Sequence, residues 1–192
     1  MLVRYTVSLL LAALSVPLIA ATTAPHATAR RQLPLPRPTI AVDSAVRLLV
    51  VAPHPDDETL GAGGLMQRVR EAGGSVRVVY LTDGDGYPEG VRIEDHVESP
   101  RPVDFRGYGR RRKAEARAAL QVLGFDRSVA TFLDFPDGGL ASLMRRYWSV
   151  RRRAFRSPYT RLDRPPKADV LIDHTEYRGE DLTQELAQIV GE

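Results

Sequence analysis

The fold of this chain is indicated by residues 47–61, RLLVVAPHPDDETLG. An apolar run of strand length, residues 48–52, ends abruptly in one imidazole and three carboxylates, and the small residues of a helix start follow. A continuous apolar run is typical of a buried parallel strand. The polar residues would then lie at the carboxyl end of that strand, which is where open α/β sheets bind their ligands.

The ionisable side chains of this stretch predict a metal site. His54 and the three acids at 56–58 would repel or crowd one another unless protons or a cation neutralise them. Imidazole and carboxylate ligands suit zinc. In a turn stiffened by two prolines, His54 and Asp57 can converge on one cation while Asp56 faces a water on it, as a general base and later a general acid. The alternative is a polar turn in which an acidic side chain only caps the next helix.

Hydrophobic periodicity divides the rest of the chain into alternating strands and helices. Strand 47–52, helix 59–72 and strand 75–82 form a βαβ unit, which predicts parallel strands with a right-handed crossover. Helices are also expected at 108–123, 140–155 and 181–190, a third strand at 129–135, a short weak strand at 170–172, and a long polar loop over 83–107. This order predicts an α/β domain with a mostly parallel sheet.

The first 44 residues are expected to lie outside this domain. Residues 1–29 contain Arg4, an apolar stretch over 7–21 and an Ala-x-Ala signature ending at Ala29, which indicate a secretory signal peptide. The apolar stretch is shorter than the roughly 20 residues of a membrane span. We therefore expect a secreted or periplasmic protein with no stable membrane span after cleavage near Ala29, or a membrane-anchored protein if cleavage does not occur. Residues 30–44 form a Pro- and Arg-rich linker, and residues 45–192 form the domain.

A family resemblance rests on four motifs of the domain. They are PHPDDE at 53–58, LTDGDG at 81–86, the Arg112-x-x-Glu115 helix that runs to Leu123-Gly124, and FLDFPDG at 132–138. The chain thereby resembles the PIG-L/LmbE-like deacetylases from about Arg47 onward, with Pro53 where the family has Ala. The resemblance implies a Rossmann-like three-layer fold and a zinc-dependent hydrolase that removes an N-acetyl group from an amino sugar or related amide. By their match to the family motif, His54 and Asp57 would hold Zn²⁺ in this chain, and Asp56 would be the base.

The third zinc ligand of that family is missing from this sequence. The family supplies it as a His in an H-P-D-H-like motif after a further strand, and no such motif occurs here. His26 falls in the signal segment, and His96 and His174 are the other candidates. The helix over 181–190 resembles the one that leads into the missing strand, so we expect the front part of a longer enzyme, lacking the C-terminal part of the fold. The alternative is an inactive truncated remnant or a non-catalytic carbohydrate- or anion-binding module.

Other polar residues have both a functional and a structural interpretation. Arg112 could bind the anionic side of the substrate or form a surface pair with Glu115. Asp137 follows the third strand and could line the site, bind substrate or orient a ligand, or it could belong to a simple Asp-Gly turn. Asp83 and Asp85 hold the same position after the second strand and have the same two interpretations.

Composition limits the kinds of partner. The net charge is only +3, and the absence of Cys excludes disulfides and thiolate metal ligands. Basic clusters at 110–113 and 145–156 are interleaved with aromatic residues. These clusters could contact phosphate or nucleic acid, or they could be solvated helix faces. We expect a small-molecule partner, an N-acetylated sugar or related amide, and no nucleic acid, while the oligomeric state is not determined by the sequence.

Overall fold

The computed structural model describes residues 40–191 and contains an open sheet of three parallel strands. The strands are β1 (Arg47–Ala52), β2 (Ser75–Thr82) and β3 (Ala130–Phe135), in the order β1-β2-β3. Leu48 pairs with Val76 across the first ladder, and Val78 pairs with Ala130 across the second. This topology confirms the predicted α/β, Rossmann-like fold.

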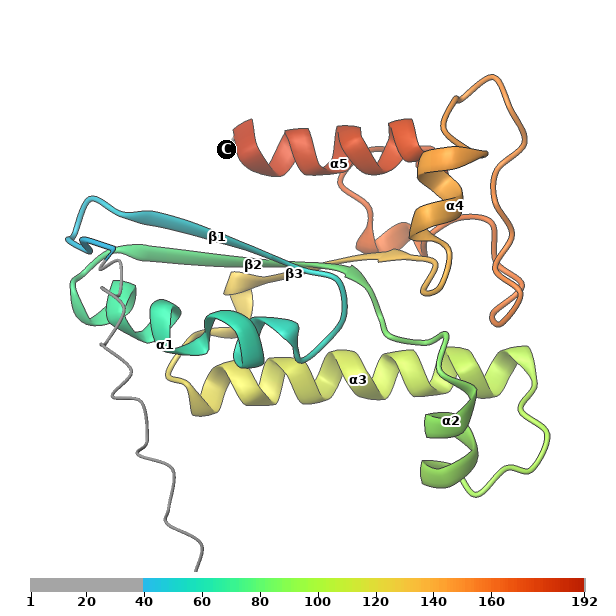
Figure 1. The fold of residues 1–192 in the computed structure, drawn as a ribbon, viewed down its shortest axis with the longest axis horizontal. Coiled ribbons are helices and arrows are strands. Elements are labelled where there is room, and N and C mark those ends of the chain that lie inside the picture. Colours follow the sequence, from blue (N-terminus) through green and yellow to red (C-terminus); the bar gives the residue numbers. More distant parts are fainter. Residues whose placement is uncertain (1–39, 192) are drawn as a thin grey trace, which may run out of the picture. The chain divides into compact units, whose positions relative to one another are not determined.

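Helices cover both faces of the sheet, as Figure 1 shows. On one face lie α1 (Asp57–Glu71) and α3 (Pro102–Val122), with α2 (Pro88–Glu94) beside α3. On the other face lie α4 (Leu140–Arg145) and α5 (Gly179–Gly191). Two 3-10 turns complete the described elements, at Arg127–Val129 and Lys167–Asp169. The arrangement has the three layers that the sequence predicted.

Each face of the sheet has its own hydrophobic core. The first core joins β1, β2 and β3 to α1 and α3, and within it the rings of Tyr80 and Phe132 stack with centroids 4.4 Å apart. The second core joins β2 and β3 to α4 and α5. Its buried residues are Val79, Leu133, Phe135, Leu143, Tyr177, Leu182 and Ile189. Because successive residues of a strand face opposite ways, neighbours such as Val78 and Val79 contribute to different cores.

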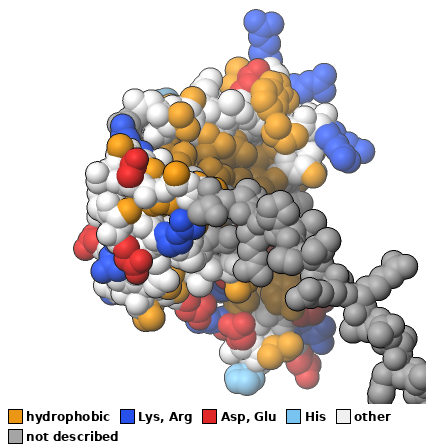
Figure 2. Space-filling view, turned by 60° about the vertical axis from the view of Figure 1, so that its left-hand side comes forward, with side chains coloured by type: hydrophobic (Ala, Val, Ile, Leu, Met, Phe, Trp, Pro, Cys, Tyr) orange, Lys and Arg blue, Asp and Glu red, His pale blue; other side chains and the backbone are white. Residues whose placement is uncertain are grey.

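The first strand is an edge strand, so the prediction that it is buried was wrong. Val51 is 46% exposed, and β1 pairs with β2 on one side only among the described residues. A cavity of about 530 Å³ lies between Leu48, Leu49 and the end of α5 at Ile189. Figure 2 shows hydrophobic side chains lining this hollow. Within residues 40–191, β1 therefore packs through one edge and through the side chains that it contributes to the two cores.

The weak strand predicted over 170–172 is absent from the structure. The backbone N–H groups of Leu171 and Ile172 donate to the carboxylate of Glu185, at 3.0 and 3.2 Å, instead of to a neighbouring strand. Thr175 Oγ1 donates to the same carboxylate at 2.6 Å. Glu185 is fully buried on α5, so a buried acid satisfies the hydrogen bonds that a sheet would otherwise have taken.

Several helix boundaries differ from those predicted. The loop expected over 83–107 contains α2, and α3 begins at Pro102, where the backbone N–H of Arg101 donates to Asp104 at 2.8 Å. The helix predicted over 140–155 ends at Arg145. Beyond it the carbonyls of Tyr147 and Trp148 accept hydrogen bonds from the start of α5, so tertiary contacts replace helical ones.

The described part of the chain has no helix that is both long enough and apolar enough to span a bilayer. The predicted signal peptide, residues 1–29, lies outside the described residues.

Candidate active site

The turn between β1 and α1 holds Asp56 in an unusual backbone conformation. Its φ of 139° lies in a region that favours glycine, and strain of this kind is concentrated at functional sites. The backbone N–H of Asp56 donates to Glu58 Oε2 at 3.0 Å, and Thr59 Oγ1 donates to Glu58 Oε1 at 2.7 Å. Glu58 is fully buried, and its carboxylate holds the turn through these two hydrogen bonds. Asp56 and Asp57 therefore make other contacts with their side chains.

His54 has a carboxylate at each ring nitrogen. Its Nδ1 lies 3.2 Å from Asp57 Oδ2, and its Nε2 lies 3.1 Å from Asp137 Oδ1. Asp57 Oδ2 also accepts the backbone N–H of His54 at 3.0 Å. The structure therefore brings three predicted site residues together and fixes the orientation of the imidazole from both sides.

Asp137 is itself held by the loops around it. Its Oδ2 accepts the backbone N–H of Gly86 at 2.9 Å, and its Oδ1 accepts that of Gly138 at 2.7 Å. A Cβ at Gly86 would lie 3.0 Å from the Asp137 carbonyl oxygen, so a larger residue would push the two loops apart. The Asp-Gly turn after β3 thus has a specific contact with His54 in addition to its role as a turn.

Arg112 reaches from α3 to the turn that follows β1. One guanidinium nitrogen, Nη2, donates to the Pro55 carbonyl and lies 2.9 Å from Asp56 Oδ2. We observe no ion pair with Glu115 in the described part of the chain. Burial lowers the pKa of Arg112, but hydrogen bonds with Tyr108 and Asp56 outweigh this effect and leave the pKa raised. Arg112 therefore remains a cation beside the Asp56 carboxylate.

A second polar cluster lies next to this site, and the sequence did not predict it. Lys113 Nζ lies 2.6 Å from Asp134 Oδ2 and 3.4 Å from both Asp83 Oδ2 and Asp169 Oδ2. Burial and then the neighbouring Asp134 raise the pKa of Asp83 far above the usual aspartate range. Burial also raises the pKa of Asp85 to about 7. The single positive charge of Lys113 balances only part of the negative charge of these acids. The folded state therefore favours the protonated forms of Asp83 and Asp85.

No pattern in the sequence singles out this cluster. Lys113 is one of two lysines among 27 basic residues, but the other, Lys167, is exposed. Asp134 has a φ of +51° within β3, which no local pattern indicates. The cluster depends on contacts between α3, two strand ends and a 3-10 turn, so it could be recognised only in the folded protein.

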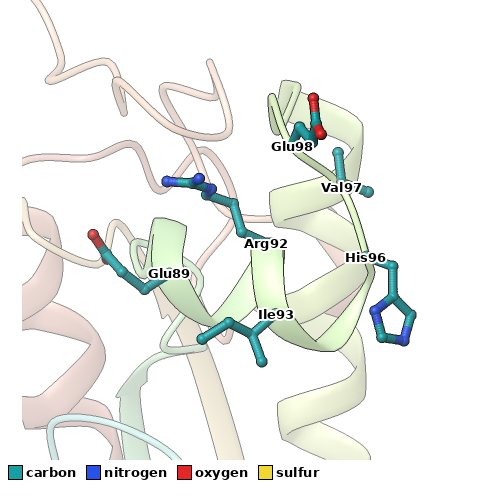
Figure 3. Close-up of a pocket in the computed structure, with 6 residues that line it drawn as sticks. All are labelled: Glu89, Arg92, Ile93, His96, Val97 and Glu98. Carbon is teal, nitrogen blue, oxygen red and sulfur yellow. The ribbon is translucent and has the colours of Figure 1, made fainter. Parts of the chain in front are cut away.

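Neither of the other two described histidines joins the site. His96 follows α2 and is exposed, and Figure 3 shows its imidazole pointing away from Glu89 and Arg92 in a surface cavity of about 480 Å³. His174 is exposed in the irregular segment before α5. Among residues 40–191, no three His, Asp or Glu side chains form a group that could hold a metal ion. Asp57 and Asp137 face opposite nitrogens of His54, so they do not converge with it on one point.

The residues that are present fit two positions of a metal site. Two ligands of one tetrahedral zinc lie about 3.3 Å apart, and His54 Nδ1 lies 3.2 Å from Asp57 Oδ2. A metal-bound His usually donates its other ring N–H to a carboxylate or carbonyl. In His54 that donor would be Nε2, and Asp137 is the carboxylate beside it. The donor set thus suits a divalent cation on the Nδ1 side of His54.

A known protein family matches most of the chain. Residues 49–192 match the PIG-L family, described as GlcNAc-PI de-N-acetylase. The chain belongs to the PIG-L family. The matched region begins within β1 and includes every residue of the candidate site, from His54 to Asp137.

Curated bacterial relatives are similar over part of this PIG-L chain. A Rhodococcus erythropolis (strain PR4) protein is 41% identical over 81 residues, which are 42% of this chain and 26% of the relative. A Mycobacterium sp. (strain KMS) protein is 38% identical over 105 residues, 53% of this chain and 32% of the relative. Both are named 1D-myo-inositol 2-acetamido-2-deoxy-alpha-D-glucopyranoside deacetylase. The matched part therefore spans between a quarter and a third of each relative.

Proposed function

We propose that this PIG-L protein is a metal-dependent N-deacetylase acting on an N-acetylated amino sugar. The observation that carries the proposal is the pairing of His54 Nδ1 with Asp57 Oδ2, beside the exposed carboxylate of Asp56. The names of the relatives support the reaction and the substrate class, because both are named as deacetylases of an acetamido sugar. Asp56 and Arg112 also line a cavity of about 320 Å³, within the range of small-molecule sites.

Each site residue has a distinct part in the proposed reaction. His54 and Asp57 would hold a divalent metal, with zinc as the expected ion, and Asp137 would keep the His54 ring in the correct orientation. When bound, the metal would supply a Lewis acid that polarises the amide carbonyl and acidifies water. Asp56, positioned by its contact with Arg112, accepts the proton of the attacking water and later returns it to the leaving amine.

A non-catalytic sugar- or anion-binding protein is the second candidate. The observation in its favour is that His54 and Asp57 are not joined by a third ligand within residues 40–191. Two protein ligands hold zinc less securely than the three of typical catalytic sites. This alternative retains the sheet, the turn after β1 and the Arg112 contact but performs no hydrolysis.

Zinc uptake by the full chain tests the metal site. We expect the wild-type chain to bind zinc in a calorimetric titration and His54→Ala to lose that binding. His96→Ala and His174→Ala are matched controls, because each removes one exposed imidazole away from the site, and both are expected to bind zinc normally. Equal zinc binding by all four proteins would show that His54 is not a ligand.

Hydrolysis of an N-acetylglucosamine derivative separates the two candidates. For an enzyme, Asp56→Asn is expected to keep zinc binding and lower kcat by about 10²- to 10⁴-fold, because the amide cannot accept the proton. Released acetate and free amine are the two products to measure. If wild type binds zinc and the sugar but releases no acetate, the non-catalytic candidate is correct.

A further inference from the structure

Five arginines that the candidate site does not use lie within nine residues, at 145–153, which read RRYWSVRRR. The stretch begins at the last residue of α4 and continues into the irregular segment that follows. All five arginine side chains belong to exposed residues. We call residues 144–153 the arginine platform.

The five charges of the platform are not neutralised by the described residues. None of these arginines forms an ion pair there, whereas nearby Arg178 contacts both Glu176 and Asp181. The closest acid on α5, Glu180, accepts the backbone N–H of Val150 at 2.7 Å. Five arginines without an ion pair among the described residues give this stretch a local positive charge, on a chain whose net charge is only +3.

Exposed apolar side chains are interleaved with these arginines. Met144 is 56% exposed, Trp148 is 40% exposed and Val150 is 50% exposed. A groove of about 780 Å³ runs between Tyr147, Trp148 and four of the arginines. Figure 2 shows Lys and Arg side chains projecting at the top of the molecule beside hydrophobic ones. Apolar side chains that are exposed together and rimmed by charged ones are typical of interaction surfaces.

The platform is fixed to the body of the domain. The Tyr147 carbonyl accepts from Gly179 N at 3.0 Å, and the Trp148 carbonyl accepts from Glu180 N at 2.9 Å. A Cβ at Gly179 would lie 2.4 Å from the Trp148 ring, so the indole lies directly against the start of α5. The platform therefore presents its charges and apolar groups without the ordering cost of a free loop.

We propose that the arginine platform binds the surface of an anionic phospholipid bilayer. Arginines attract anionic headgroups, while Trp and aliphatic side chains insert at the level between headgroups and acyl chains. Nucleic acid would use the cations and could stack on Trp148, but it gives Met144 and Val150 nothing to contact. The platform continues from α4, which begins three residues after Asp137 and lies on the sheet face opposite to α1 and α3.

Trp148 makes a direct test possible because it is the only tryptophan in the chain. The full chain is titrated with vesicles of phosphatidylcholine containing roughly 30% phosphatidylglycerol and, separately, with phosphatidylcholine alone. We expect a blue shift of Trp148 emission only with the anionic vesicles, and a loss of that shift as salt is raised. Binding through the apolar residues 7–21 does not require anionic headgroups, so the titration with phosphatidylcholine alone distinguishes it from the proposed contact.

Two triple variants complete the test. Replacing Arg151, Arg152 and Arg153 by Gln is expected to weaken anionic-vesicle binding by about 100-fold, since each arginine contributes a factor of about five. The control replaces Arg92, Arg127 and Lys167 by Gln, which removes the same charge elsewhere, and is expected to bind within a few fold of wild type. The proposal is overturned by unchanged Trp148 emission, by equal effects of the two triple variants, or by a salt-sensitive emission change with duplex DNA and none with vesicles.

Discussion

At the scale of single residues, Lys113 is a buried cation surrounded by carboxylates. It is buried on α3 among Asp83, Asp134 and Asp169, and its closest contact, with Asp134, is 2.6 Å. Burial lowers the pKa of Lys113, but the charges of Asp83 and Asp134 outweigh this effect and leave it raised. The ammonium is therefore charged at neutral pH, and the surrounding acids depend on it.

Removing this ammonium is expected to destabilise the fold strongly. Lys113→Met keeps the length of the side chain but leaves buried carboxylates without their cation, which costs about 3–5 kcal/mol. Urea unfolding at neutral pH measures the change. Lys167→Met is the matched control, because Lys167 is exposed and should change stability by less than about 0.5 kcal/mol. Similar losses in both variants would mean that the buried charge has no special role.

At the scale of elements, α3 approaches the end of β2 closely enough to need a glycine. A Cβ at Gly109 would lie 3.0 Å from Asp83 Cβ and 3.1 Å from Asp85 Cβ. At Gly107, two residues earlier in the same helix, a Cβ would meet only the flexible end of Arg110 at 3.7 Å. The two glycines share a helix but differ in whether tertiary packing requires them.

Alanine at these two positions should therefore have opposite effects. Gly109→Ala is expected to destabilise by about 1–3 kcal/mol, because the methyl group pushes α3 away from the strand end. Gly107→Ala should stabilise by about 0.5–1 kcal/mol through better helix propensity. Thermal unfolding followed by circular dichroism compares them. A gain in stability from both substitutions would show that α3 and β2 lie further apart than described.

At the scale of the whole molecule, buried acids make stability depend on pH. The pKa values of Asp83 and Asp85 are both raised, mainly by burial and to a smaller extent by neighbouring carboxylates. The pKa of Asp85 is raised to about 7. When the pKa of an acid is higher in the folded state than in the unfolded state, where it is about 4, its protonated form stabilises the fold. This contribution is complete below the unfolded-state pKa and is lost as the pH rises through the folded-state pKa. Asp134 acts in the opposite sense, since its pKa is lowered and its contribution is lost only as pH falls.

The melting temperature is accordingly expected to fall between about pH 5 and pH 8. Asp83→Asn, which mimics the protonated acid, should flatten this fall and raise the melting temperature at the upper end. Asp173→Asn serves as the control, because Asp173 is an exposed aspartate outside the cluster, and it should leave the pH profile unchanged. A wild-type melting temperature that rises from pH 5 to pH 8 would contradict the assignment of buried protons.

The sequence by itself determined the α/β class, the three parallel strands and the proximity of the predicted site residues that follow β1. The apolar run over 48–52, which stops before Pro53, forms a strand, and the helix-forming residues after it form α1. A strand, a helix and a second strand in succession then favour the parallel pairing of β1 with β2 through a crossover. His54, Asp56 and Asp57 are adjacent in the chain, so their proximity needed no tertiary information.

Only the tertiary structure decided which distant residues complete that site. The Nε2 of His54 meets Asp137, 83 positions away, and Asp56 meets Arg112, 56 positions away. The exposure of β1, the buried Glu185 in place of a fourth strand, and the Lys113 cluster likewise depend on the packing of separate elements. Local propensity governs neighbours within a few residues, whereas these contacts are set by sheet order and by the burial of charge among elements far apart in the chain.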